Sequence, residues 1–134
     1  MKNTNRVEIQ MKEVLEEYSK EVARATNNSI DVVAKEAVRK LRNTSPKRSG
    51  PKHTRKYAEG WGLERNKSRQ NRRINEVVVR NKTNYQLTHL LENGHVIRNG
   101  KGEYGRYNGI KHIAPVEDWA ADELPREVER ELET

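Results

Sequence analysis

The chain of 134 residues has the length of one domain, but only 32% of its residues are hydrophobic, 5% are aromatic and 35% are charged. A chain this polar buries only a modest core, so we expect residues 1–134 to form one domain that gains part of its order from partners. The absence of cysteine excludes disulfides and thiolate metal sites. We expect no signal peptide and no membrane-spanning segment, and hence synthesis in the cytoplasm.

The net charge of +7 is unevenly distributed along the chain. Residues 1–38 carry a net charge of −1, residues 39–82 carry +12, residues 83–114 carry +2 and residues 115–134 carry −6. A basic middle and an acidic end suit binding to nucleic acid or to charge-matched proteins. In a homo-oligomer, the acidic end of one copy would meet the basic middle of the next.

Apolar residues recur every three or four positions in two consecutive stretches, which predicts one amphipathic helix over about residues 6–42. The first stripe comprises Val7, Met11, Val14, Tyr18, Val22 and Ala25, and the second comprises Ile30, Val33, Ala34, Ala37, Val38 and Leu41. Residues 26–29 between them favour caps and turns, so an alternative is two helices, the second capped by Asn28 or Ser29. We favour one helix that is continuous or slightly kinked. We expect both stripes to lie in the core.

The next segment, 43–56, is rich in Pro, Gly, Ser and cations and predicts a flexible loop. It is either a solvated linker or a basic arm that touches phosphate or an acidic protein surface. Alternation of apolar and polar residues from Tyr57 to Glu64 then predicts a half-buried strand. The β-branched run Val77–Val79 predicts a second strand, and the two pair as an antiparallel hairpin.

The most apolar short stretch runs from Tyr85 to Gly94 and predicts a short helix that closes the core. Leu87, Leu90 and Leu91 share one face of this helix, and Asn93-Gly94 favours its end. Residues 95–97 are compatible with a short third strand, and residues 95–112 are otherwise expected to form a flexible loop. Pro115 begins a last helix, in which Pro125 introduces a kink or a restart and the acidic end beyond it frays.

No pattern of residues predicts catalysis or a cofactor. A metal-dependent nuclease would use His89, Glu92, His95 and His112, but zinc-protease spacing places two histidines four residues apart on one helix. Here His89 and His95 are six apart, and Gly94 ends the helix between them. We therefore expect no enzyme, no metal and no cofactor, and we expect these histidines to be structural.

Nucleic-acid binding is the stronger alternative function. The block 39–82 contains fifteen basic residues, with Tyr57 and Trp61 nearby for base stacking. Since no helix-turn-helix, zinc-finger or RNA-binding-sheet signature accompanies them, such binding would be independent of sequence and steeply dependent on salt.

Five short motifs in the chain together resemble a bacteriophage family. They are Ser45-Pro46-Lys47-Arg48-Ser49-Gly50; Tyr57-Ala58-Glu59-Gly60-Trp61; Val77-Val78-Val79; Tyr85-Gln86-Leu87-Thr88-His89-Leu90-Leu91-Glu92-Asn93-Gly94-His95; and His112-Ile113-Ala114-Pro115. Over about residues 33–122 the chain resembles the tail-completion, or tail-to-head joining, proteins of long-tailed phages (siphoviruses) of Gram-positive bacteria. The run from Tyr85 to His95 followed by His-Ile-Ala-Pro is the most specific part. The loops around residues 50–57 and 103–108 are longer than the family pattern.

The resemblance implies an α+β fold: a long N-terminal helix on a small antiparallel sheet, a short central helix, a C-terminal helix and long flexible loops. It implies a structural virion protein that forms a hexameric ring at the tail end. We expect the protein to be a monomer or a weak oligomer in solution and to form the ring only on the tail. The implied partners are the tail tube protein and the head-completion, or stopper, protein of the connector, with passing double-stranded DNA as a further contact and no membrane. Loops 43–56 and 95–112 would fold against these neighbours.

The basic block suggests which side chains make such contacts. We expect acidic partner surfaces or the DNA passage to be contacted by Lys47, Arg48, Lys52, Arg55 and Lys56.

Overall fold

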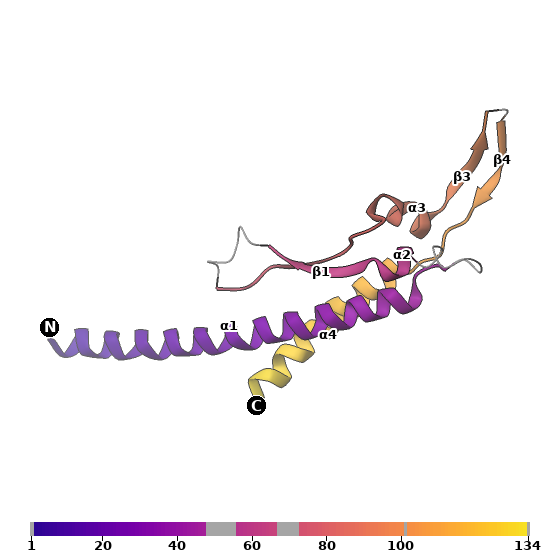
Figure 1. The fold of residues 1–134 in the computed structure, drawn as a ribbon. Coiled ribbons are helices and arrows are strands. Elements are labelled where there is room, and N and C mark those ends of the chain that lie inside the picture. Colours follow the sequence, from indigo (N-terminus) through magenta and orange to yellow (C-terminus); the bar gives the residue numbers. More distant parts are fainter. Residues whose placement is uncertain (1, 48–55, 67–72, 101, 134) are drawn as a thin grey trace.

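A computed structural model of the chain describes residues 2–47, 56–66, 73–100 and 102–133 (Figure 1). Within these ranges the elements are, in chain order, α1 (Lys2–Thr44), α2 (Lys56–Glu59), β1 (Trp61–Arg65), β2 (Val77–Asn81), η3 (Tyr85–Leu87), α3 (Thr88–Asn93), β3 (His95–Asn99), β4 (Gly102–Tyr107) and α4 (Ile113–Glu133). This is the α+β fold that the resemblance implied, with the described strands arranged as two separate antiparallel pairs.

Helix α1 is continuous over 43 residues, which confirms the predicted long helix. The helical backbone is intact through the polar residues in its middle, whose side chains bond to the helix itself or to the segment before β2. The Ser29 hydroxyl donates to the Ala25 carbonyl at 2.7 Å, one turn earlier in the helix. The Asn27 side chain donates to the Arg73 carbonyl at 3.0 Å and accepts from the Asn75 N–H at 2.8 Å. These bonds tie the middle of α1 to the segment that leads into β2.

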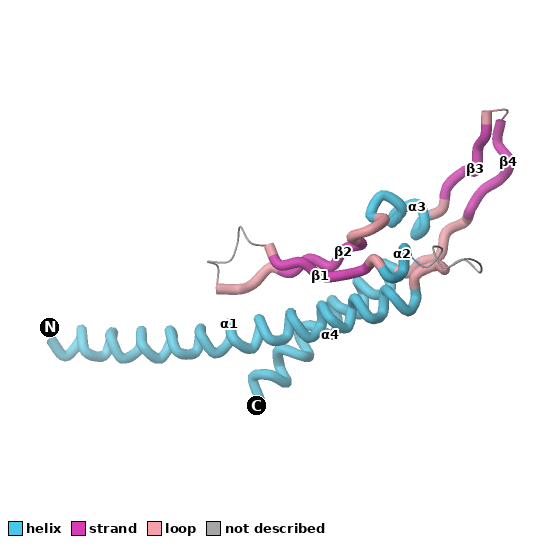
Figure 2. The backbone as a smooth tube through the Cα atoms, viewed as in Figure 1, coloured by secondary structure: helices cyan, strands magenta, loops and turns pink. Residues whose placement is uncertain are grey.

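The core lies where the C-terminal half of α1 meets α4 and the hairpin of β1 and β2 (Figure 2). The second predicted stripe is buried there, except for the half-buried Ile30. The central cluster consists of Ala37, Val38, Leu41, Tyr57, Trp61 and Val116. Partly buried side chains packed against it are Leu63, Val79, Leu87, Leu91, Ile113 and Trp119. The cluster is small, as the polar composition predicted.

The strands β1 and β2 form the expected antiparallel hairpin, with Trp61 opposite Asn81 and Arg65 opposite Val77. The predicted start of the first strand at Tyr57 is wrong, because the chain there makes the helical turn α2. Tyr57 and Ala58 are both buried while Glu59 is exposed. A strand would place Glu59 on the same face as Tyr57 and bury its charge, whereas a helical turn directs it to solvent.

The helix predicted over Tyr85–Gly94 is confirmed as η3 followed by α3. It ends at Gly94, whose N–H donates to the Leu90 carbonyl at 2.8 Å and whose φ of 86° lies in the left-handed region.

The segment expected as a flexible loop, 95–112, instead contains a second antiparallel hairpin. It pairs His95 with Tyr107 and has a bulge between Ile97 and Arg98. The hairpin includes the third strand predicted at residues 95–97. The loop prediction was wrong because the glycines 102 and 105, read as flexible, adopt positive φ of 137° and 148° within β4. The hairpin of β3 and β4 extends away from the core (Figure 1).

Helix α4 carries Pro115 in its first turn, as predicted, and then continues through Pro125 to Glu133. The prediction that the end beyond Pro125 frays is therefore wrong. Ion pairs hold this end, since Arg130 lies 2.6 Å from both Glu123 and Glu127. Among the described residues, no helix combines the length and the apolarity needed to cross a membrane.

The first stripe of α1 is not buried as predicted. Met11, Val14 and Tyr18 are 60%, 68% and 66% exposed, whereas Ala25 is fully buried. The reason is geometric: α4 ends near Arg24, which lies 3.4 Å from Glu131, and α1 extends beyond the core (Figure 1). The N-terminal half of α1 is therefore a projection with an apolar face.

We predict that Gly94→Ala destabilises the fold by about 2–4 kcal/mol, because a Cβ at this positive φ would lie 2.2 Å from the Tyr107 carbonyl oxygen. Urea unfolding followed by tryptophan fluorescence measures the change. The control is Gly100→Ala, whose Cβ would have no heavy atom within 4 Å and which should change stability by less than about 1 kcal/mol. Equal stability of the two variants would contradict the close approach of Gly94 to β4.

Candidate functional site

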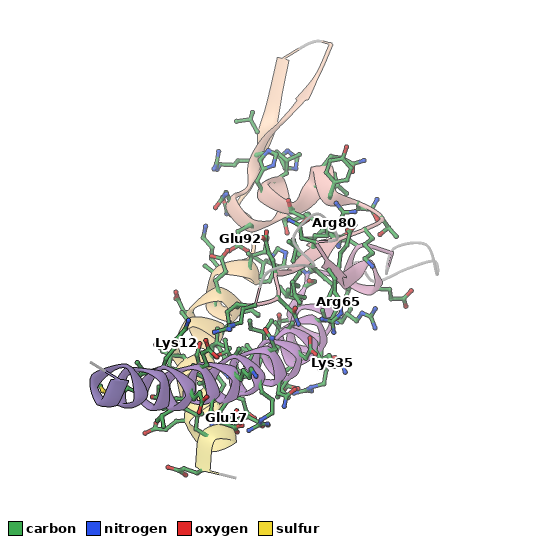
Figure 3. All side chains as sticks on the ribbon, turned by 90° about the vertical axis from the view of Figure 1, so that its left-hand side faces the viewer. Lys12, Glu17, Lys35, Arg65, Arg80 and Glu92 are labelled. Carbon is green, nitrogen blue, oxygen red and sulfur yellow. The ribbon has the colours of Figure 1, made fainter. Side chains whose placement is uncertain are left out.

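The side chain of Glu92 joins α3 to the start of α4 (Figure 3). Its Oε1 accepts from the backbone N–H groups of His112 at 2.7 Å and Ile113 at 2.8 Å, and its Oε2 accepts from Ala114 at 2.9 Å. The first N–H groups of a helix have no helical partner, and the positive end of the helix dipole favours an anion there. Glu92 thus caps α4 from about twenty residues away in the sequence.

His112 continues this polar cluster into the core. Its Nδ1 lies 2.7 Å from the Ile110 carbonyl and 2.9 Å from Glu92 Oε1, and its Nε2 lies 2.7 Å from the Tyr57 hydroxyl. Since a carbonyl oxygen only accepts, Nδ1 carries the proton, and in the neutral ring Nε2 accepts from Tyr57. The rings of Tyr57, Trp61 and His112 also meet edge to face, with centroids 5.5–6.3 Å apart.

Two groups of the cluster have shifted pKa values. Burial raises the pKa of Tyr57 to about 12, and the negative charge of Glu92 adds to this. Burial disfavours the charge of Glu92, but the three backbone N–H groups and the neighbouring His112 outweigh it and lower the pKa of Glu92 below its ordinary value. Glu92 is therefore an anion and Tyr57 a neutral donor at physiological pH.

Two further buried contacts surround the cluster. Trp61 Nε1 donates to the Ser45 hydroxyl at 2.7 Å, which fixes the end of α1 against β1. The Asn81 side chain donates to the Tyr57 carbonyl at 2.6 Å and accepts from the Asn84 N–H at 2.8 Å. Among the described residues, every buried side-chain polar atom has a partner. The cluster is therefore a hydrogen-bonded structural junction between α3, α4 and the core.

The four residues of the metal-site hypothesis do not form such a site. His89 is exposed on α3, and the ring of His95 lies beside that of Tyr107 with centroids 5.7 Å apart. Glu92 and His112 are engaged with each other and with the backbone of α4. In the part of the chain that the structure describes, no three His, Asp or Glu side chains are placed to hold a metal ion.

The structure brings together the two most specific motifs of the resemblance, Tyr85–His95 and His112–Pro115. Leu87, Leu91 and Ile113 pack against the core, and the Ile110 N–H donates to the Leu91 carbonyl at 2.8 Å. The remaining members have peripheral positions: Tyr85 is 71% exposed, the Thr88 hydroxyl donates to the Tyr85 carbonyl at 2.8 Å, Leu90 accepts the Gly94 N–H, and His89 and Pro115 are exposed. Most of these motif residues therefore build the junction, and few of them are available for contact.

The five cations expected to contact partners lie mostly beyond what the structure describes. Lys47 is exposed just after α1, and its Nζ lies 3.1 Å from the Asn43 carbonyl. Arg48, Lys52 and Arg55 lie outside the described residues, and Lys56 begins α2. Their proposed role stays a prediction.

Sequence reasoning missed the role of Glu92 and its link to Tyr57. One signal was present: Glu92 is the one charged residue in the apolar helix 85–94, where a buried carboxylate needs strong donors. The identity of those donors, backbone N–H groups far along the chain, had no signature in the sequence.

The described part of the chain combines a small core, a polar junction and two projecting elements. Residues 9–94, more than half of the chain, match the family of HK97-gp10-like proteins, which are tail components of bacteriophages. The chain belongs to this family, so it is a structural component of a phage tail, located in the virion and in contact with other virion proteins. No curated protein and no solved structure matched it.

We predict that Glu92→Gln lowers the free energy of unfolding by about 2 kcal/mol at pH 7, because an amide has one acceptor oxygen for three N–H groups. A carboxylate with a lowered folded-state pKa stabilises the fold above its unfolded pKa, and this stabilisation is lost as pH falls through the folded value. The difference in free energy of unfolding between wild type and Glu92→Gln should therefore shrink as pH falls below about 4.

Urea unfolding between pH 3 and pH 7 measures this difference. The control is Glu129→Gln, an exposed position of α4. A difference that is independent of pH would contradict the capping role of the Glu92 carboxylate.

Proposed function

We propose that the protein completes the phage tail: six copies form a ring at the end of the tail tube and join it to the DNA-filled head. The chain is a monomer before assembly and carries out no reaction. Its neighbours are the tail tube protein on one side and the head-completion, or stopper, protein of the connector on the other. This places it at the head–tail interface of the virion.

One observation supports the adaptor role above the others. The hairpin of β3 and β4 extends from one end of the small core and the N-terminal half of α1 extends from the other (Figure 1). Two projections in opposite directions suit a protein that contacts two different neighbours. The family membership agrees with this, since it makes the chain a tail component.

The charge distribution supports a ring. Head-to-tail contact between copies uses two different surfaces of each copy and closes into a ring when the rotation permits. The segments 39–82, with a net charge of +12, and 115–134, with −6, carry the opposite charges that such a contact requires. The alternative, sequence-independent binding of nucleic acid by residues 39–82, gains no support from the family match.

We predict that purified protein, added first to tails that lack it and then to filled heads, produces joined particles in electron micrographs. The reason is that a completed tail end is the surface that the head recognises. The control omits the protein. Efficient joining in that control would contradict the proposal, and so would protein that fails to bind to tails.

We further predict that reversing the charge of Lys47, Arg48, Lys52, Arg55 and Lys56 to Glu lowers the yield of joined particles by about tenfold or more, because like charges then face an acidic surface. The control is Lys35→Glu, an exposed cation on α1. A normal yield from the five-fold variant would rule out these residues as contacts.

A further inference from the structure

The N-terminal half of α1 carries an apolar face that no described element covers. We call Met11, Val14, Leu15 and Tyr18 the N-terminal stripe; they are 60%, 68%, 63% and 66% exposed. Their spacing places all four within one arc of the helix. Large apolar side chains gathered on one face of a projecting helix mark a contact surface, whereas scattered ones would not.

An open groove of about 490 Å³ runs along this stripe. It is lined by Met11, Lys12, Leu15, Glu16, Ser19 and Arg73. Arg73, one of these lining residues, donates a hydrogen bond to Ser19. Its volume exceeds that of an apolar side chain, and Glu16 among its lining residues offers a carboxylate to a cation.

A complementary surface lies on the hairpin of β1 and β2. Since Leu63 and Val79 pack against the core, strand alternation turns Glu64, Val78 and Arg80 to the opposite face. We call this the outer sheet face. Val78 is 43% exposed at its centre, beside the pair of Arg80 and Glu64 at 2.6 Å. The Lys82 side chain crosses Gly62 at the edge of this face, where a Cβ would lie 3.1 Å from Lys82 Cε.

We infer that the N-terminal stripe of one copy packs across the outer sheet face of a second copy, with Val78 entering the groove beside Leu15. This inference rests on the proposed ring and adds a second contact between neighbouring copies to the one proposed between segments 39–82 and 115–134. Charge selects the occupant: residues 11–22 hold two lysines and four glutamates, a net charge of −2. The outer sheet face holds two cations, Arg80 and, at its edge, Lys82, against one acidic residue, Glu64, a net charge of +1. The two surfaces attract each other.

Pairing of two stripes with each other would be less favourable. It would bring two surfaces of net negative charge together, with glutamates facing glutamates across the seam. It would also form a two-fold pair, in which both copies use the same surface and no ring results. The contact between stripe and sheet uses two different surfaces of each copy, so it continues from copy to copy.

The dimensions of the two surfaces are compatible. Residues 2–22 of α1 form a rod about 30 Å long, whereas a five-residue strand extends about 17 Å. One projecting helix therefore spans the whole sheet of its neighbour. Gly62 leaves the outer sheet face shallow at its edge, which allows a helix to approach once the flexible end of Lys82 moves.

The test exploits the absence of cysteine from the chain. Leu15→Cys and Val78→Cys are prepared as separate variants, mixed in equal amounts, added to tails that lack the protein and oxidised. Because each chain then has one thiol, every disulfide joins two copies. We expect peptide mass spectrometry to identify disulfides between positions 15 and 78. They should exceed by about tenfold those formed when Glu13→Cys, on the opposite side of α1, replaces Leu15→Cys.

The outcomes separate this inference from the proposed function. Two outcomes would overturn the inference and leave the proposed function intact. In the first, rings form on tails but contain no disulfide between positions 15 and 78. In the second, the disulfides in the rings join mainly two copies of position 15. A disulfide between position 15 and another virion protein would overturn it as well. Unmodified protein that forms no ring on tails would overturn both.

Discussion

The contact between the Glu92 carboxylate and the first N–H groups of α4 is the interaction on which the rest of the structure depends. Helix α4 packs on α1 through Val116, Ile113 and Trp119, but this apolar packing satisfies none of the N–H groups at the start of the helix. One carboxylate with three backbone bonds and a buried histidine fixes the start of that helix instead. The same junction holds the base of the hairpin of β3 and β4, since that hairpin connects α3 to α4. One ionised group therefore links the start of α4 to the helix that precedes this hairpin.

The sequence pattern predicted an element well where its apolar face is the face that is buried in the structure. The second stripe of α1, the hairpin of β1 and β2, and the helix ending at Gly94 each followed from residues that alternate or recur on one face. The patterns were misleading where a polar contact decides. At Tyr57 the expected strand is a helical turn, which keeps the charge of Glu59 in solvent. Beyond Pro125, α4 continues with Arg130 paired to Glu123 and Glu127. The cap of α4 by Glu92 joins residues distant in sequence, and no local pattern shows it.

The prediction that the first stripe of α1 is buried was wrong for a different reason. Its periodicity is that of a buried helix, and the helix forms as predicted, yet its apolar face has no cover in the described part of the chain. A pattern of apolar residues predicts that a face will be buried, but it does not say whether the covering surface belongs to the same chain. In a tail component, which works among other virion proteins, the cover can come from a neighbour.

The formed hairpin of β3 and β4 also changes the energetics expected of assembly. A flexible segment at 95–112 would lose about 1–2 kcal/mol of backbone entropy per residue on ordering, which weakens any contact it makes. Paired strands have already lost that freedom during folding, so binding through them costs less. Helix α1 is likewise formed before its stripe is covered. Rigid projections favour contacts whose selectivity comes from matched shape and charge, and such contacts can be reproduced identically at each position of a ring.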